Sequence, residues 1–426
     1  MPRHYSLTRP LRQRNIPAMR EIPEDLRLPA DIDEQSIVRT AAALRPVIRG
    51  FRDEIDREQR LPKALVEQFH AAGFYSMVMP RALGGLQVDP LTYVRVVELL
   101  AEGAGSAGWN VANNSIGQLV TLGLTDEGVN EVYARGADTV IAGTAVMGGG
   151  RAVPVDGGYR VTGRWPFGTG CQESSWMLGS FQIFDGDQPR RSADGFAYWR
   201  GIFQRSEAQL VEGSWDVAGM RATGSFDWTV TDVFLPERRT MVHAGIPLDN
   251  QWKRWPGISY AIPAQAWVGP HHSAVITGIA RAGIEALIEL ASAKTPRGRG
   301  AGAGRLCENP QVQDAVGRAD TLLNAGRAYR SVTVADVWNT VAAGGETTLA
   351  QRARCRLAAA NAADSAREAM DLMYRQGGST SYRRDSRLAE CWRDLHVVGQ
   401  TAALAPEWYP IGGRVLLGMD PGPRMR

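Results

Sequence analysis

The sequence has few cysteines and no long hydrophobic run. Its 426 residues include four cysteines, which lie far apart, form no CxxC pair and have no histidine cluster near them: Cys171, Cys307, Cys355 and Cys391. This scarcity argues against a disulfide framework and a zinc site, so no metal is expected. No apolar run approaches the roughly 18 residues of a membrane span, and the N-terminus lacks the apolar core of a signal peptide. We therefore expect a reduced, cytoplasmic protein with no membrane partner.

An excess of one charge is also missing. Lysine and arginine number 48 against 45 acidic residues, a formal net charge of +3. So even a balance argues against nucleic acid as the main partner and favours a small-molecule ligand. The exception is local, because the first 20 residues contain five arginines and no acid. We interpret residues 1–30 as a loose basic tail, with a transit peptide or a partner-docking arm as the alternatives.

The chain has enough residues for two or three domains, and its periodicity divides it into three parts. Residues 31–135 carry apolar side chains at spacings of three and four, with further helices expected at 61–72 and 90–102. Residues 136–245 alternate in the manner of strands, with a hairpin signal at Asp156–Gly158 and strands expected at 176–184, 195–203 and 226–235. We predict a helical domain followed by a β-barrel or sandwich.

The helical period returns in residues 246–426, in long stretches at 273–294, 310–341 and 348–374. Such lengths predict a four-helix bundle. The basic glycine segment PRGRGAGAGR, residues 296–305, follows a helix rather than a strand, so it is neither a dinucleotide-binding turn nor a P-loop. The order helical, β, helical predicts an α+β fold and argues against a doubly wound sheet.

Two stretches of the middle part could carry chemistry. Residues 165–176, WPFGTGCQESSW, place glycines beside aromatic residues, where a backbone can approach a flat ligand closely. A glycine-rich turn with core aromatics explains the same residues. In residues 215–236, Arg221, Thr223 and Ser225 alternate on one side of an expected strand. A solvated edge strand is at least as good an interpretation.

Together these stretches resemble a known family. The segments VDGGYRVTGRWPFGTGC, WDVAGMRATGS and VFLPE are similar to flavin proteins with the acyl-CoA dehydrogenase fold. Within that fold, the W-x-F-x-[ST]-G pattern resembles the two-component flavin-dependent monooxygenases. The resemblance extends from about residue 31 to the C-terminus and implies a homotetramer with flavin at a subunit interface. It also implies reduced FMN or FAD from a separate flavin reductase, and O2 that forms a C4a-hydroperoxide and hydroxylates a small organic substrate, which we expect to be aromatic.

The last third distinguishes two branches of the superfamily. The segment RQGG at residues 375–378, followed by Arg393 and Asp394, resembles the family's GG loop and the helix after it. Acyl-CoA dehydrogenases commonly carry a glutamate base about eight residues beyond that aspartate, where this chain has Thr401 and Ala402. His396 occupies a place where the monooxygenases often carry a functional histidine, so we predict it to be catalytic, since imidazole exchanges a proton near neutral pH. A structural histidine between helices is the alternative.

The resemblance also implies contacts for other residues. The predicted cofactor-binding residues are Trp165, Phe167, Thr169, Cys171, Arg297, Arg305, Arg375, Gly377 and Gly378. The predicted substrate residues come from the segment GWNVANNS and are Trp109, Asn110, Asn113 and Asn114. A buried polar helix face would explain the substrate candidates without a ligand. A solvated loop would explain Arg297 and Arg305 without a phosphate. We interpret His271 and His272 as the start of a helix, because no acid or cysteine lies at ligand spacing.

The main hypothesis is therefore the oxygenase component of a two-component flavin monooxygenase. No nicotinamide-binding motif appears in the sequence, so the reductase is expected to be a second protein. The rival hypotheses are an acyl-CoA dehydrogenase or flavin oxidase with a displaced base, and a non-catalytic flavin-binding homologue. The sequence leaves open whether carbon, nitrogen or sulfur is oxygenated.

Overall fold

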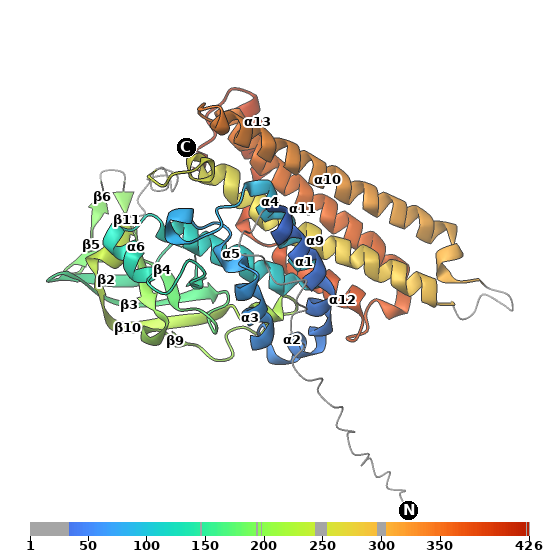
Figure 1. Cartoon of the computed structure of the whole chain (residues 1–426), viewed down its shortest axis with the longest axis horizontal. Helices are drawn as coiled ribbons and strands as arrows, with labels where there is room; N and C mark the ends of the chain where they lie inside the picture. Colours follow the sequence, from blue (N-terminus) through green and yellow to red (C-terminus); the bar gives the residue numbers. More distant parts are fainter. Residues whose placement is uncertain are drawn as a thin grey trace, which may run out of the picture.

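The computed structural model describes residues 34–144, 147–192, 195–196, 198–242, 254–295, 304–422 and 424–425. It confirms the α+β architecture, with a β domain at one end, a bundle of long helices at the other and the N-terminal helices packed between them (Figure 1). None of the helices in these ranges combines the length and the apolar character needed to span a bilayer.

The first part of the chain is helical, as predicted. Asp89 fixes the start of its central helix, because its carboxylate accepts hydrogen bonds from the backbone N–H groups of Leu91 and Thr92, and Pro90 occupies the first turn. Thr125 caps the last helix in the same way through Gly128. The helices are α1 (Glu34–Gly50), α2 (Arg52–Glu58), α3 (Lys63–Ala71), α4 (Pro90–Gly103), α5 (Gly105–Thr121) and α6 (Asp126–Val132).

The middle part forms a mixed sheet, whose strands follow the order β11-β8-β4-β2-β3-β10-β9. The predicted hairpin joins β2 to β3 through Gly157, whose φ of +75° a residue with a Cβ adopts only at a cost. Trp165 stacks on Trp228 in its core, with ring centroids 4.3 Å apart. The strands that form this order are β2 (Gly149–Val155), β3 (Gly158–Gly168), β4 (Trp176–Asp185), β8 (Trp199–Gln204), β9 (Gln209–Leu210), β10 (Phe226–Pro236) and β11 (Thr240–Val242).

The strand expected at 226–235 is confirmed, but the alternating residues before it do not form a strand. The alternation of Arg221, Thr223 and Ser225 indicated a strand, but Arg221–Thr223 is a 3-10 turn, η5. Met220 and Gly224 flank it at φ of +56° and +51°, which an extended strand cannot contain. The strand β10 therefore begins only at Phe226.

The last part is the predicted bundle of long helices, and one of its boundaries needs correction. The helix expected from Ser273 begins nine residues earlier at Ala264, with Pro270 inside it. His271 and His272 thus lie within the helix rather than at its start. Packing of a mostly buried helix outweighs the local cost of the proline. The helices are α8 (Ile258–Ala261), α9 (Ala264–Ala293), α10 (Pro310–Ala342), α11 (Leu349–Gly377), α12 (Arg387–Val398) and α13 (Trp408–Leu416).

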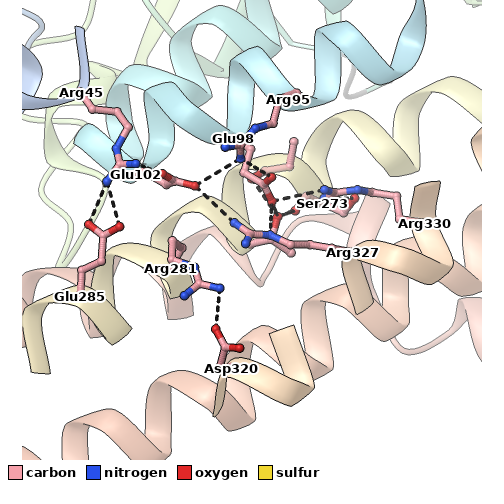
Figure 2. A network of polar contacts seen from close by, with 12 residues as sticks. Arg45, Arg95, Glu98, Glu102, Ser273, Arg281, Glu285, Asp320, Arg327 and Arg330 are labelled. Carbon is pink, nitrogen blue, oxygen red and sulfur yellow. Dashed lines mark hydrogen bonds and ion pairs between the residues drawn. The ribbon is translucent and has the colours of Figure 1, made fainter. Parts of the chain in front are cut away.

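A buried polar network joins the N-terminal helices to the bundle (Figure 2). Glu98 and Glu102 on α4 are 3% and 2% exposed. Arg327 Nε on α10 lies 2.8 Å from Glu98 Oε1, and Arg330 Nη2 lies 3.2 Å from the same oxygen. Arg45 Nη1 on α1 lies 2.8 Å from Glu102 Oε2. These ion pairs hold α4, and with it the neighbouring α5, on the bundle.

Candidate functional site

Helix α5 carries the predicted asparagines to the β domain. Asn110 and Asn114 are one turn apart, and both line a narrow crevice with Thr169 and Gly170. The Nδ2 of Asn110 donates to the carbonyl of Ser106 at 2.9 Å and to that of Ala222 at 3.4 Å. The structure therefore brings two predicted substrate residues together with one predicted cofactor residue.

Three buried hydroxyl groups follow one another behind that crevice. Thr169 Oγ1 lies 2.8 Å from Ser225 Oγ, which lies 2.7 Å from Thr223 Oγ1. The backbone N–H of Gly170 donates to the carbonyl of Thr223 at 2.9 Å, which binds the loop after β3 to η5. This chain of hydroxyls fixes the Thr169 side chain and explains why Thr223 and Ser225 belong to the site without lying on a strand.

Phe167 and Trp165 are two residues apart on β3 and have opposite environments. Phe167 has a φ of +63° and is 54% exposed, with its ring edge-to-face against Trp215 at 6.3 Å. A left-handed conformation is rare for a bulky residue and is often found at functional sites. Trp165 is fully buried, and its indole N–H donates to the carbonyl of Ser180 at 2.7 Å. Trp165 thus lies in the β core, and its ring is not accessible in this chain.

Cys171 is buried beneath the same loop. Its thiol donates to the carbonyl of Gly224 at 3.3 Å. Burial raises the pKa of the Cys171 thiol to about 11, so it is protonated at neutral pH. Its contribution is packing and support of the loop rather than nucleophilic chemistry.

The other two substrate candidates lie toward a different neighbour. The Nδ2 of Asn113 donates to the carbonyl of Trp109 at 3.1 Å, one turn back on α5. The ring of Trp109 lies 5.1 Å from that of His272 on α9. His272 is thus a candidate that was not predicted from the sequence. No sequence pattern indicates it, because Trp109 and His272 lie on different helices and meet only in the folded chain.

The predicted phosphate-binding residues gather at the far end of the bundle. Lys294 Nζ donates to the carbonyl of Gly377 at 3.1 Å, and the backbone N–H of Leu306, next to Arg305, donates to the carbonyl of Lys294 at 2.8 Å. A Cβ on Gly377 would come within 2.1 Å of Ser381 Oγ, and Gly378 has a φ of +58°, so the turn requires both glycines. Arg375 is exposed nearby on α11, and Arg297 lies outside the described residues.

His396 lies near the end of α12, beside α11. Its Nε2 is 3.3 Å from Asp371 Oδ1, which also accepts a hydrogen bond from the indole N–H of Trp392 at 2.9 Å. The imidazole is 32% exposed. Asp371 shares an open groove with Arg375. His396 is therefore close to the predicted phosphate-binding residues and does not line the crevice at Thr169.

Asp394 was not among the predicted site residues. Its carboxylate accepts a hydrogen bond from the backbone N–H of Met220 at 2.6 Å, which anchors α12 to the loop before η5. Burial of the Asp394 carboxyl, with the charge of Glu390 beside it, raises its pKa to about 7. It lines an open hollow with Glu390 and Arg393. A titratable group so perturbed in a hollow is a functional candidate.

The available donors fit an organic cofactor better than a metal. No group of three histidine, cysteine or acidic side chains with metal-binding geometry occurs in the part of the chain that the structure describes. The exposed ring of Phe167 and the positioned hydroxyl of Thr169 offer an apolar face beside a hydrogen-bonding edge. A flat, partly polar ring system such as flavin matches that arrangement.

Comparison with known proteins identifies related chains. Residues 33–132 match the family model of the acyl-CoA dehydrogenase N-terminal domain, and residues 271–406 match that of the C-terminal domain. An indole-3-acetate monooxygenase of Pseudomonas putida is 30% identical over 394 residues, covering 91% of this chain and 96% of that relative. The oxygenase subunit HsaA, a flavin-dependent monooxygenase of Mycobacterium tuberculosis, is 29% identical over 400 residues, covering 92% and 98%.

Solved structures agree with these matches. The HsaA monooxygenase from M. tuberculosis has a TM-score of 0.82 at 26% identity, and the match covers 93% of this chain and 100% of that chain. XiaF from Streptomyces, solved with FADH2 and glycerol, has a TM-score of 0.83 at 22% identity, covering 91% and 96%. At that identity the likeness to XiaF shows the shared fold.

Proposed function

The chain belongs to the flavin-dependent monooxygenases of the acyl-CoA dehydrogenase family, and on that premise we propose that it is the oxygenase component of a two-component system that hydroxylates a small aromatic substrate. The observation that carries the proposal is the loop after β3. It presents the fixed hydroxyl of Thr169 beside the asparagines of α5, and the exposed ring of Phe167 comes two residues earlier, at the end of β3. Thr401 and Ala402 offer no carboxylate at the place of the dehydrogenase base.

Reduced flavin, when bound, supplies the electrons and the carbon that reacts with O2. The protein residues bind, orient and exclude water. Phe167 offers an apolar face against the ring system, and Thr169 offers a hydroxyl whose orientation Ser225 and Thr223 fix. Asn110, held by the Ser106 carbonyl, closes the other side of the crevice with its amide. Such fixed hydrogen-bonding groups in a water-poor site favour oxygen transfer over loss of peroxide.

Three further features belong to the proposal. The flavin is FAD, the form held in reduced state by the structural relative XiaF. The electrons come from NADH through a separate flavin reductase, since the relatives include an oxygenase subunit and the chain shows no nicotinamide-binding turn. The enzyme works in the cytoplasm, a reducing compartment that suits four free cysteines.

A homotetramer completes the site in this proposal. The end of α9 and the turn after α11, next to Arg305 and Arg375, lie at the end of the bundle that is farther from the β domain, whereas Thr169 follows β3 in the β domain (Figure 1). His396 lies on α12, which Asp394 anchors to the loop before η5. One chain therefore offers two separate half-sites. Pairing the bundle end of one copy with the β domain of another would join the ring-binding loop to the phosphate-binding arginines. Arginine suits phosphate oxygens through its planar pair of donors.

The proposal is tested by supplying electrons in two ways. The purified chain with FAD and NADH should consume no NADH and form no hydroxylated product. Addition of a flavin reductase, or of chemically reduced FAD, should start hydroxylation of phenols or indoles from a test panel. Rapid NADH oxidation by the chain alone would contradict the two-component assignment. Dehydrogenation of an acyl-CoA would favour the dehydrogenase alternative.

A further inference from the structure

The turn η5 is the point where the two sides of the crevice at Thr169 meet. The carbonyl of Ala222 accepts a hydrogen bond from Asn110 Nδ2 on α5 at 3.4 Å. The next carbonyl, that of Thr223, accepts one from the backbone N–H of Gly170, in the loop after β3, at 2.9 Å. A displacement of η5 would therefore move the α5 side and the β-domain side of the crevice relative to each other.

The same turn supports the exposed ring of Phe167. The carbonyl of Arg221 accepts a hydrogen bond from the indole N–H of Trp215 at 3.2 Å. The ring of Trp215 in turn lies edge-to-face against that of Phe167, with centroids 6.3 Å apart. Three consecutive carbonyls of η5 thus hold the three parts of the proposed site, which are the α5 amide, the loop after β3 and the ring at the end of β3.

The turn has a conformation that its own residues do not favour. Met220 and Gly224 flank it with φ of +56° and +51°. A left-handed φ is costly for a residue with a long side chain and persists only where the surroundings hold it. The N–H of Thr223 donates to the carbonyl of Met220 at 3.1 Å and closes the turn. The position of Met220 therefore sets the position of η5.

Met220 is held by helix α12 of the bundle. Its backbone N–H donates to Asp394 Oδ1 at 2.6 Å. The residue before it, Gly219, lies directly against the helix backbone, because a Cβ there would come within 2.5 Å of the carbonyl carbon of Arg393 and 2.7 Å of the nitrogen of Asp394. The loop before η5 and α12 are therefore in close backbone contact, which one carboxylate hydrogen bond secures.

The Asp394 carboxylate differs from its neighbour on the same helix. Glu390, one turn earlier, forms an ion pair with Arg52 and so joins α12 to α2. Asp394 takes part in no ion pair within the described ranges, and its contact there is the backbone N–H of Met220. A hydrogen bond to a charged acceptor is stronger than one between neutral groups. The arrangement therefore indicates that the main contact of Asp394 is with the loop.

We propose that Asp394 is a positioning residue for oxygen transfer. By holding the N–H of Met220 it fixes η5, and through η5 it aligns Phe167, Thr169 and Asn110 around the bound ring system. The bundle thereby sets the geometry of a site that lies on the β domain of the same chain. This inference rests on the proposed function and adds to it a residue that acts through the turn.

The first test is backbone hydrogen exchange of the purified full chain without flavin, followed by mass spectrometry. Asp394→Leu keeps the size of the side chain and removes the acceptor. Amides of residues 220–226 should then exchange about 10- to 100-fold faster, the effect of losing a hydrogen bond to a charged group. Asp394→Asn retains an acceptor oxygen and should restore most of the protection. The matched control is Asp385→Asn, since Asp385 lines the same open hollow, is 73% exposed and should leave this exchange unchanged.

The second test is the share of consumed O2 that appears in hydroxylated product. Asp394→Leu should lower this share by about 10-fold and raise hydrogen peroxide, because a small misplacement of positioned groups slows the productive step. Asp394→Asn should keep most of the wild-type share. Gly219→Ala is a second variant, which presses the loop away from α12 while Asp394 stays intact, and it should loosen residues 220–226 in the same way.

Three results would overturn the proposal. One is unchanged exchange at residues 220–226 in folded Asp394→Leu or Gly219→Ala protein. Another is an equal acceleration across α12 and β10, which would assign Asp394 to general stability. The third is local loosening with the wild-type share of hydroxylated product. Because exchange is measured without flavin, failure of the oxygenase function appears separately, as absence of hydroxylated product from the wild-type chain.

Discussion

Burial decides the chemistry of single side chains in this protein. Phe167 at the end of β3 and Cys171 in the loop after it lie four residues apart, yet Phe167 is 54% and Cys171 0% exposed. The buried thiol keeps its proton, whereas the exposed ring is free to meet a ligand. Burial also shifts the pKa values of Asp394 and His272, in opposite directions. It makes the Asp394 carboxyl easier to protonate and the His272 imidazole harder to protonate.

Cys171 should be inert to alkylation in the folded protein. Its pKa of about 11 leaves almost no thiolate at pH 8, and the thiolate is the reactive form. Cys307 is only partly buried and should be labelled first by iodoacetamide. Peptide mapping by mass spectrometry measures both sites in one sample. Fast labelling of Cys171 before unfolding would show that the loop opens and that its packing role is wrong.

His396 remains the predicted catalytic residue. His396→Ala should shift the products from hydroxylated substrate to hydrogen peroxide and slow oxygen transfer by roughly 10²-fold, a size typical of general acid–base catalysis. His70→Ala is the matched control, because His70 is 33% exposed and lies 3.0 Å from Asp138, much as His396 is 32% exposed and lies 3.3 Å from Asp371.

The readout is the ratio of product to peroxide at saturating substrate. A folded His396→Ala protein with the wild-type ratio would assign the histidine to the structural alternative, a bridge between α11 and α12. The control guards against a general effect of removing a surface histidine paired with an aspartate.

At the scale of elements, the sequence predicted well which segments are helices and strands. It predicted less well which neighbours the side chains of those segments contact. The bundle helices and the hairpin at Gly157 follow from periodicity and turn chemistry. The sequence could not show which domain each of the four predicted substrate residues in GWNVANNS contacts. Trp109 and Asn110 are neighbours in the chain, yet they contact different domains. Likewise the sequence did not show that Asp394 of α12 holds Met220, which has a left-handed φ of +56° just before η5.

The network of Glu98 should dominate the stability of the contact between α4 and the bundle. Glu98→Ala leaves Arg330 buried without its acid, which should reduce the free energy of unfolding by about 3–5 kcal/mol. Glu289→Ala is the control, because Glu289 is 57% exposed and its pair with Arg49 should contribute under about 1 kcal/mol. Chemical denaturation measures both. Equal losses in the two variants would mean that the buried network adds no more than a surface pair.

The same network predicts the direction of a pH effect. Burial alone would raise the pKa of Glu98, but the charges of Arg330 and Arg327 outweigh it and lower the pKa to about 2 from an ordinary value of 4.5. A carboxyl with a lowered pKa contributes stability that is present above pH 4.5 and is lost as the pH falls toward 2. Wild-type protein should therefore lose stability in this range faster than Glu98→Ala. Parallel acid denaturation curves for the two proteins would contradict this.

At the scale of the whole molecule, the proposed pairing of half-sites from two copies predicts an assembly. Light scattering of the purified chain should give a tetramer, or at least a dimer, because the proposed site joins Arg305 and Arg375 of one copy to the Thr169 loop of another. A monomer that binds reduced FAD tightly would contradict the shared site. The family could be predicted from sequence motifs. The distance between the proposed half-sites could not, since it depends on how the long helices of the bundle are arranged relative to the β domain.

The most direct test of the oxygenase function follows the oxygen atom. The chain is mixed under nitrogen with chemically reduced FAD and a small aromatic substrate that binds it, and ¹⁸O2 is then admitted without any NADH. We predict a hydroxylated product that carries one ¹⁸O atom by mass spectrometry, because the enzyme transfers one atom of O2 to the ring. A product whose new oxygen comes from water, or release of hydrogen peroxide alone with every aromatic substrate that binds, would contradict the assignment.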